Sequence, residues 1–225
     1  MSVLVVKVGG AVAGESAAEV LALAEGNEVC VVHGAGPQIT AEMARAGIPV
    51  EFVDGRRMTT AAGLEVVRSS LAAVNAALCA ALGERAVPLF GDEIGLEATV
   101  APGLGLVGDP VPSRPAAVVE ALERGAIPVV APLAEGPLNV NADEAAAALA
   151  LGLGADRLVF LTDVDGLLLD GEVVEQIGVD EAAALLAGGT LEGGILPKLG
   201  AAVTAARGGV AASIGRTQIP AAVAA

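Results

Sequence analysis

The sequence predicts an α/β fold in which a largely parallel sheet is covered by helices on both faces. Two short β-branched runs, residues 3–8 and 28–32, each end in a turn that carries glycine, and each is followed by a segment rich in Ala, Leu and Glu. The same alternation continues along the chain, and strands that alternate with helices favour parallel pairing. A chain of 225 residues is long enough to form one such domain with a substantial core.

The individual elements follow from residue type and from the glycines and prolines between them. Strands are predicted where β-branched and other apolar residues run together, at residues 3–8, 28–32, 86–89, 127–131, 157–162 and 211–214. Helices are predicted where Ala, Leu and Glu dominate, at residues 15–25, 37–46, 61–82, 116–124, 143–153, 179–187 and 197–207. Residues 102–115 are rich in Gly and Pro and are expected to form the one long irregular segment.

Composition excludes two classes of partner. The net charge of −15 and the absence of Trp and Tyr leave neither the basic surface nor the stacking side chains that nucleic-acid binding requires. No uncharged stretch approaches the ~18 residues needed to cross a bilayer, so no membrane association is expected. No export signal precedes the first strand, and Cys30 and Cys79 lie in apolar runs typical of buried thiols rather than a disulfide. A cytoplasmic protein is expected.

Only two of the chain's cations are lysines, Lys7 and Lys198, and both lie close to glycines. The other ten are arginines. Lysine is a compact point charge and arginine a planar fork, so a site that places one positive charge against a phosphoryl oxygen distinguishes them. Chance retention of two lysines in an arginine-biased chain is the alternative.

Two segments at predicted strand ends are suited to binding an anion through backbone amides. Lys7 is followed by Gly9 and Gly10, and paired glycines let a phosphate approach the main chain. Residues 33–37, His-Gly-Ala-Gly-Pro, lead from a strand into a helix, whose N-terminus favours an anion. An ordinary tight turn is the alternative for residues 33–37, and His33 is interpreted as a structural donor rather than a catalytic base.

Three further segments carry polar side chains. Arg57 lies in a turn before a long helix, where it could clamp a carboxylate or form a solvated ion pair. Residues 139–143 place two asparagines and Asp143 before an Ala-rich helix, which is more than a helix cap requires. Residues 162–166, Thr-Asp-Val-Asp-Gly, close a hydrophobic strand at the position where α/β sheets meet ligands.

Two familiar patterns are interpreted as accidental. Gly103, Gly105 and Gly108 match the dinucleotide pattern, but Asp109 and Pro110 follow where a helix should begin. Residues 163–166 resemble the start of a calcium loop, but three leucines occupy the next positions and cannot bind calcium. With one histidine in the chain, no protein metal site is predicted.

Taken in order, these segments resemble the amino acid kinase family over residues 3–209, most specifically at residues 138–143 and 193–198. The resemblance implies an open three-layer αβα sandwich with a mainly parallel central sheet. Residues 1–225 would form a single domain, with an acceptor-binding lobe at residues 1–130 and an ATP-binding lobe at residues 131–225.

The resemblance also assigns roles to individual residues. Lys7 and Lys198 would act on the transferring phosphoryl group from opposite lobes, and Asp143 would orient both. The substrate-binding residues would be Ala35, Gly36, Arg57 and Asn139. The nucleotide-binding residues would be Gly9, Gly10, Thr162, Asp163, Val164, Asp165, Gly166 and Gly194.

The activity implied by the resemblance is ATP-dependent phosphorylation of the γ-carboxylate of N-acetyl-L-glutamate, a step of arginine biosynthesis. A carboxylate with a pKa of about 4.3 is already an anionic nucleophile at neutral pH and needs no general base. ATP is expected with Mg²⁺ held mainly by the nucleotide phosphates. Two alternatives stay open: a kinase acting on a different or carrier-linked carboxylate, such as aminoadipate or glutamate, and a catalytically silent ligand-binding regulatory module.

The sequence departs from the family pattern in four places. Ala35 stands where the family has a glycine, residues 90–110 are short for a lid over the acceptor, and a loop and helix on the adenine side are missing after residue 209. No helix precedes the first strand, an extension that accompanies arginine-inhibited hexamers. A homodimer without that control is therefore expected, paired through the apolar face of residues 71–82.

Overall fold

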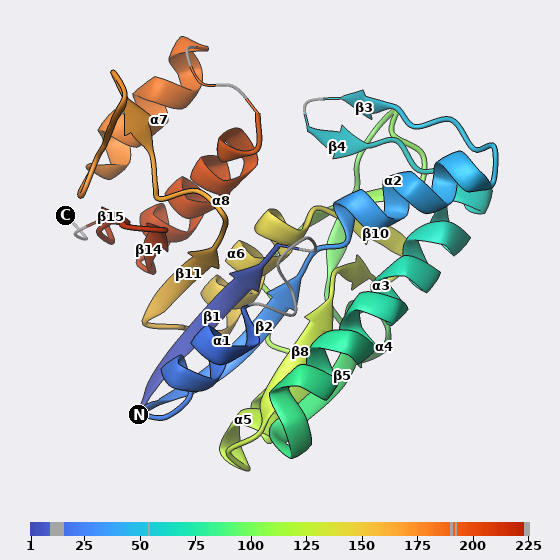
Figure 1. The fold of residues 1–225 in the computed structure, drawn as a ribbon, viewed down its shortest axis with the longest axis horizontal. Helices are drawn as coiled ribbons and strands as arrows, with labels where there is room; N and C mark the ends of the chain where they lie inside the picture. The colour runs from blue at the N-terminus through green and yellow to red at the C-terminus, as the bar shows by residue number, and fades with distance from the viewer. Residues whose placement is uncertain (10–15, 54, 190, 192, 223–225) are drawn as a thin grey trace.

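The centre of the molecule is a seven-stranded sheet in the order β15-β14-β11-β1-β2-β8-β5 (Figure 1). The structure is a computed structural model that describes residues 1–9, 16–53, 55–189, 191 and 193–222. All neighbouring strands of this sheet are parallel except β14 and β15, which confirms the predicted α/β class. The strands are β1 (Ser2–Val8), β2 (Asn27–His33), β5 (Ala86–Phe90), β8 (Ile127–Ala131), β11 (Arg157–Leu161), β14 (Ala211–Ile214) and β15 (Thr217–Ile219).

Alternate side chains of β1 enter two separate cores. Val5 belongs to the core beneath α6 and α8, whereas Val6 and Val8 belong to the core beneath α1, α2 and α3. Successive side chains of a strand point to opposite faces, so a central strand buried on both sides is apolar throughout. The helices are α1 (Ala17–Leu23), α2 (Gly36–Arg45), α3 (Ala61–Leu82), α4 (Gly91–Ile94), α5 (Ala116–Glu123), α6 (Ala142–Leu153), α7 (Val179–Gly188) and α8 (Ile195–Arg207), with a 3-10 turn at Gly83–Arg85. The three-layer αβα arrangement is confirmed.

The elements of the central sheet agree closely with the sequence predictions. Residues 61–82, 127–131 and 211–214 coincide with α3, β8 and β14. The other predicted strands and helices are found with shifted ends, and α8 begins two residues before its predicted start. The apolar pattern is reliable here because these elements are buried on at least one face and are bounded by glycine or proline at one or both ends.

The prediction of one long irregular segment at residues 102–115 is wrong. β7 (Val107–Pro110) lies inside it and pairs with β6 (Ala98–Val100) and with β10 (Leu138–Val140). β9 (Leu133–Ala134) completes a four-stranded sheet. A Cβ atom on Gly108 would lie 2.8 Å from the Cβ of Ala98, so this glycine permits close packing rather than disorder. β10 likewise replaces the loop expected before α6.

Two hairpins were not predicted. β3 (Phe52–Val53) pairs with β4 (Arg56–Arg57) and projects beside α2 (Figure 1), and β12 (Leu168–Leu169) pairs with β13 (Glu172–Val173). Strands of two residues are too short to show the alternation that identifies a strand. The β12–β13 turn places Asp170 and Gly171 at positive φ, which agrees with the preference of Asp-Gly for tight hairpins.

The long helix α3 is a core helix. With the 3-10 turn that follows it, α3 has the length and hydropathy of a membrane span, and 39% of that window is buried inside the protein. Leu71, Val74, Leu78 and Leu82 pack into the core formed by α1, α2 and the sheet. A dimer contact through the face of residues 71–82 stays a prediction, although the chain itself covers these four side chains. The exposed face of this stretch carries small residues such as Ala73 and Ala77.

Candidate active site

Three predicted site segments meet at the carboxyl ends of adjacent strands. In the registers of β1 with its two neighbours, Val8 lies opposite His33 of β2 and opposite Leu161 of β11. The residues after these strands, Gly9, Gly34 and Thr162, therefore begin at one edge of the sheet. This is where open parallel sheets bind ligands, beside a strand whose two neighbours connect in opposite directions.

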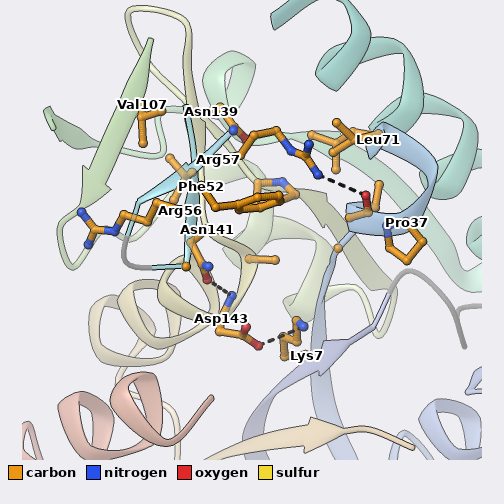
Figure 2. Close-up of a pocket in the computed structure, with 18 residues that line it drawn as sticks. Lys7, Pro37, Phe52, Arg56, Arg57, Leu71, Val107, Asn139, Asn141 and Asp143 are labelled. Atoms are coloured by element: carbon orange, nitrogen blue, oxygen red, sulfur yellow. Dashed lines mark hydrogen bonds and ion pairs between the residues drawn. The ribbon is translucent and has the colours of Figure 1, made fainter. Parts of the chain in front are cut away.

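The best-defined contact at this edge joins Lys7 to Asp143. Lys7 Nζ lies 2.9 Å from Asp143 Oδ1, and both side chains are more than nine-tenths buried. Asp143 stands in the first turn of α6, and Asn141 caps that helix by accepting hydrogen bonds from the backbone N–H groups of Asp143 and Glu144 (Figure 2). Because Asn141 provides the cap, the carboxylate of Asp143 is free to face Lys7.

Arg57 lies at the other end of the same cavity. Its guanidinium donates to Thr40 Oγ1 at 2.7 Å and to the Gly36 carbonyl oxygen at 3.2 Å, and it stacks on the Phe52 ring, 4.6 Å from the ring centroid. Arg57 is 7% exposed, and burial lowers its pKa. Among the described residues no carboxylate pairs with this guanidinium. A buried cation without an anionic partner is costly, so this end of the cavity favours an anionic ligand.

A cavity of about 270 Å³ brings Lys7 and Asp143 together with the predicted substrate residues (Figure 2). All four of those residues line it, namely Ala35, Gly36, Arg57 and Asn139. Asn139 is fixed by a hydrogen bond from its Nδ2 to Thr59 Oγ1 at 3.0 Å. The cavity has a cation at each end and amides between them, which is the arrangement expected for a small dianionic ligand.

The replacement of a glycine by Ala35 is accommodated by the backbone. Ala35 precedes α2 with extended φ and is 2% exposed, so its methyl group is packed in the core while its main chain borders the cavity. Gly36 opens α2, and a Cβ there would meet nothing within 4 Å. The turn therefore presents its main chain to a ligand without needing three glycines.

Lys198 lies in the first turns of α8 and belongs to the same electrostatic cluster. Its Nζ donates to the Gly194 carbonyl oxygen at 3.1 Å. Burial and the nearby Lys7 lower its pKa, while Asp143 and Asp163 act in the opposite direction. Among the described residues Asp143 forms an ion pair with Lys7 and not with Lys198, so the structure shows one of the two predicted contacts of Asp143.

The predicted nucleotide segment is a loop supported by the β14–β15 turn. The Arg216 N–H donates to the Asp165 carbonyl oxygen at 2.8 Å, and Gly166 has a φ of 153° at a point where a Cβ would lie 2.6 Å from Thr217 Oγ1. Thr162 donates to the Asp163 carboxylate at 3.2 Å, and Val164 is exposed. Gly9 lies at the end of β1, and Gly10 lies outside the described residues. The chain after residue 209 thus forms a hairpin that braces this loop.

His33 is a buried structural group. Asn75 Nδ2 donates to the Val129 carbonyl oxygen at 2.9 Å and lies 3.1 Å from His33 Nε2. Nε2 therefore accepts, and the proton sits on Nδ1, which lies 3.4 Å from the Gly34 carbonyl oxygen. Burial, with a smaller effect of Lys7, lowers the pKa of His33 to about 4. The imidazole is neutral at pH 7 and holds the turn that carries Ala35.

Sequence reasoning missed Thr40 and Phe52 of this site and gave Arg56 no role of its own, whereas the helix cap that it left open for Asn141 is confirmed. Thr40 lies one helical turn after Gly36, a spacing that could have indicated a shared face of α2. Phe52 and Arg56 belong to the short β3–β4 hairpin, which has no periodic signal. Among the described residues there is no group of three or more His, Cys, Asp and Glu side chains arranged to hold a metal ion.

The comparisons with known proteins agree with this geometry. The model of the amino acid kinase family matches residues 2–215. The chain belongs to the amino acid kinase family. Among the relatives of this amino acid kinase, the acetylglutamate kinase of Rubrobacter xylanophilus is 44% identical over 224 residues, covering 95% of this chain and 88% of the relative. The acetylglutamate kinase of Dinoroseobacter shibae is 38% identical, covering 95% of this chain and 80% of the relative.

Solved structures show the same fold. A protein of Streptococcus mutans superposes with a TM-score of 0.89 at 28% identity, over 98% of this chain and 99% of that one. The N-acetylglutamate synthase of Neisseria gonorrhoeae, solved with coenzyme A and N-acetylglutamate, superposes with a TM-score of 0.83 at 25% identity, over 99% of this chain and 60% of that one. A carbamate kinase of Giardia lamblia, at 16% identity and a TM-score of 0.71, shares the fold.

Proposed function

We infer that this chain catalyses the ATP-dependent phosphorylation of the γ-carboxylate of N-acetyl-L-glutamate, in arginine biosynthesis. The acetylglutamate kinases that resemble it at 38–44% identity over most of their length support this activity. The single structural observation that carries it is the cavity with Lys7 at one end and, at the other, a buried Arg57 that has no carboxylate partner among the described residues. N-acetyl-L-glutamate carries two carboxylates, one for each end.

In the proposed complex, Arg57 binds the α-carboxylate of the acceptor, because its fork can accept a carboxylate in two hydrogen bonds. The main chain at Ala35 and Gly36 and the side chain of Asn139 line the cavity between the two ends. The γ-carboxylate then faces Lys7. We assign residues 1–130 to the acceptor lobe and residues 131–225 to the ATP lobe.

In the phosphoryl step, a γ-carboxylate oxygen attacks the γ-phosphorus of ATP and the bond from that phosphorus to the β,γ-bridging oxygen breaks. The products are an acyl phosphate and ADP. Two anions must approach in line, so positioning and charge neutralisation account for most of the catalysis. Lys7 and Lys198 would neutralise the phosphoryl oxygens, and Asp143 would hold Lys7 in place.

The nucleotide would lie at the carboxyl ends of β1 and β11, against Gly9, Gly10 and Gly194 and the loop of Thr162, Asp163, Val164, Asp165 and Gly166. Mg²⁺ would be held mainly by the nucleotide phosphates and would lower the charge on the leaving group. The two lysines and the glycine-bearing turns fit a polyphosphate, because they combine point charges with open backbone. A homodimer and a cytoplasmic location remain predictions.

The competing proposals differ in what they require of the site. A carrier-linked acceptor would need a basic rim around the cavity, and a chain of net charge −15 offers little. A catalytically silent regulatory module would need the groups that bind anions but would not need both Lys7 and Lys198. Positive charge placed against a transferring phosphoryl group contributes to turnover rather than to binding.

An acceptor screen tests the proposal. The enzyme is incubated with ATP, Mg²⁺ and hydroxylamine, which traps acyl phosphates as hydroxamates, and with N-acetyl-L-glutamate, glutamate, aspartate, aminoadipate or a carrier-linked glutamate in turn. Hydroxamate is expected from N-acetyl-L-glutamate in preference to the others. Product from another acceptor alone would replace the substrate assignment, and no product from any acceptor would favour the silent module.

A further inference from the structure

Arg56 is an ion-paired residue next to Arg57, and neither the predicted site nor the phosphoryl step uses it. Adjacent residues of a strand point to opposite faces, so the two arginines of β4 leave the hairpin in different directions (Figure 2). Arg57 reaches α2 across the cavity. Arg56 reaches the opposite side, where Asp109 of β7 and Glu144 of α6 lie.

The contacts of Arg56 form a small cluster with two carboxylates. Its Nε and Nη2 donate to Glu144 Oε1 at 3.1 and 2.9 Å, and its Nη1 donates to Asp109 Oδ1. The Arg56 side chain is 28% exposed, as is that of Glu144. Charge-assisted hydrogen bonds from a guanidinium to partly buried carboxylates fix the orientation of the arginine side chain better than a fully solvated ion pair does.

Two sets of side-chain hydrogen bonds tie β3 and β4 to the rest of the molecule, those of Arg57 to α2 and those of Arg56 to Glu144 and Asp109. β3 and β4 have two residues each, and Phe52 is 55% exposed. An isolated two-stranded hairpin is marginally stable at best in water. Its base is tied by Thr59, whose N–H and carbonyl bond to Leu104 and Leu106, but the tip carries the two arginines. Once the acceptor carboxylate engages Arg57, Arg56 is the tether that remains on the other side.

The partner of this tether adjoins the phosphoryl site. Glu144 follows Asp143 in the first turn of α6, and Asn141 accepts hydrogen bonds from the N–H groups of both. The Arg56 cluster therefore connects the hairpin to the same helical turn that holds Asp143 against Lys7. Both the hairpin that carries Arg57 and the Lys7–Asp143 ion pair are thus connected to the first turn of α6.

We propose that Arg56 is a positioning residue that, through Glu144 and Asp109, fixes the β3–β4 hairpin and so sets the reach of Arg57 toward the acceptor carboxylate. The inference rests on the proposed function for its kinetic consequence, but the anchoring of the hairpin does not depend on which acceptor is used. Arg56 also lines the acceptor cavity, but its guanidinium is engaged by Glu144 and Asp109, so its proposed action is through Arg57.

The test compares Arg56→Met, Glu144→Gln and the double variant with wild type, and uses Arg45→Met as the matched control. Arg45 is an exposed arginine on α2 that pairs with Glu42 one turn away. For Arg56→Met we expect the KM for N-acetyl-L-glutamate to rise about 10-fold, with kcat and the KM for ATP changed less than about 3-fold. Glu144→Gln should act in the same direction, and the double variant should be no worse than Arg56→Met.

A second measurement reports the hairpin without any substrate. Hydrogen exchange of the amides around β3 and β4 should be faster in Arg56→Met than in wild type and unchanged in Arg45→Met. Arg56→Lys keeps the positive charge but lacks the planar guanidinium. Its KM for N-acetyl-L-glutamate should lie between those of Arg56→Met and wild type. If wild type forms no acyl phosphate from N-acetyl-L-glutamate, the proposed function fails while the exchange result still decides the anchoring.

Four outcomes would overturn the proposal. An unchanged acceptor KM in Arg56→Met would show that Arg56 does not set the reach of Arg57, and unchanged exchange would show that it does not anchor the hairpin. A fall in kcat at constant KM would make Arg56 a direct participant in the phosphoryl step. Equal rises in the KM for N-acetyl-L-glutamate and the KM for ATP, together with a lower Tm, would show that Arg56 only stabilises the fold.

Discussion

Lys7 Nζ and Asp143 Oδ1 lie 2.9 Å apart, and this contact joins the first strand of the chain to the helix that begins 142 residues along it. The pair is buried, so removing either charge leaves the other without its partner. Asp143→Asn is expected to lower kcat at least 100-fold, because Lys7 loses the group that aims it. Steady-state kinetics measures the effect, with Asp180→Asn, a fully exposed carboxylate, as the control. Activity within 3-fold of wild type would remove Asp143 from the mechanism.

Lys198→Arg tests whether the site needs an ammonium rather than a positive charge. The Lys198 amine donates to the carbonyl oxygen of Gly194, the cap residue before α8, and a planar guanidinium cannot place its charge at the same point. We expect ATP binding to change little and kcat to fall about 100-fold. Titration calorimetry with ATP and the hydroxamate assay separate binding from turnover. Full turnover in this variant would refute the role assigned to Lys198.

Arg57→Met is expected to raise the KM for N-acetyl-L-glutamate about 100-fold or more and to leave the KM for ATP nearly unchanged. The variant removes the buried guanidinium that faces the cavity and that bonds to Thr40 and Gly36. Its folded state should be at least as stable as wild type, since it no longer buries an unpaired charge. Thermal unfolding without ligand checks this, and a large drop in Tm would show that Arg57 is structural instead.

His33 predicts a specific loss of stability in acid. The pKa of His33 is lowered from 6.5 to about 4 by burial and by Lys7. Between pH 6.5 and pH 4 the imidazole is therefore protonated in the unfolded chain and neutral in the native state. Stability should be constant above pH 6.5 and fall as the pH drops toward 4, by roughly 3 kcal/mol from this group.

The measurement is direct because His33 is the one histidine of the chain. In the untagged protein, NMR of the imidazole nitrogens should show the Nδ1–H tautomer at pH 7 and no titration until about pH 4. Asn75→Leu, which removes the hydrogen bond to Nε2, serves as a comparison. Protonation near pH 6.5 in wild type would contradict the buried, neutral assignment.

Two glycines inside helices should respond to alanine in opposite ways. A Cβ on Gly152 of α6 would fall on the backbone of Ser113, whereas a Cβ on Gly200 of α8 meets nothing within 4 Å. Gly152→Ala should destabilise the protein by about 2 kcal/mol or more through overpacking. Gly200→Ala should stabilise it by about 0.5–1 kcal/mol, because alanine loses less entropy in a helix. Urea unfolding of both variants gives the comparison, and equal effects would contradict the packing argument.

The sequence determined most of the central fold. β8, β14 and α3 appear at their predicted bounds because apolar or alanine-rich segments that end at glycine or proline leave few ways to bury their surfaces. The sequence failed at the four-stranded sheet and the small hairpins. There the strands have two to four residues, and Gly108 serves close packing, so local pattern contains no signal.

The sequence also placed the candidate residues, but not their partners. The sequence indicates a site that binds anions. The features that indicate it are the two retained lysines, the glycines that follow strands and the acidic residue before a helix. That Lys7 meets Asp143, that Arg57 has no carboxylate partner among the described residues, and that Arg56 holds Glu144 and Asp109 were decided by the tertiary structure alone. Each depends on which strand edge and helix end come together across many residues of chain, and that is set by packing of the whole sheet rather than by any local run of residues.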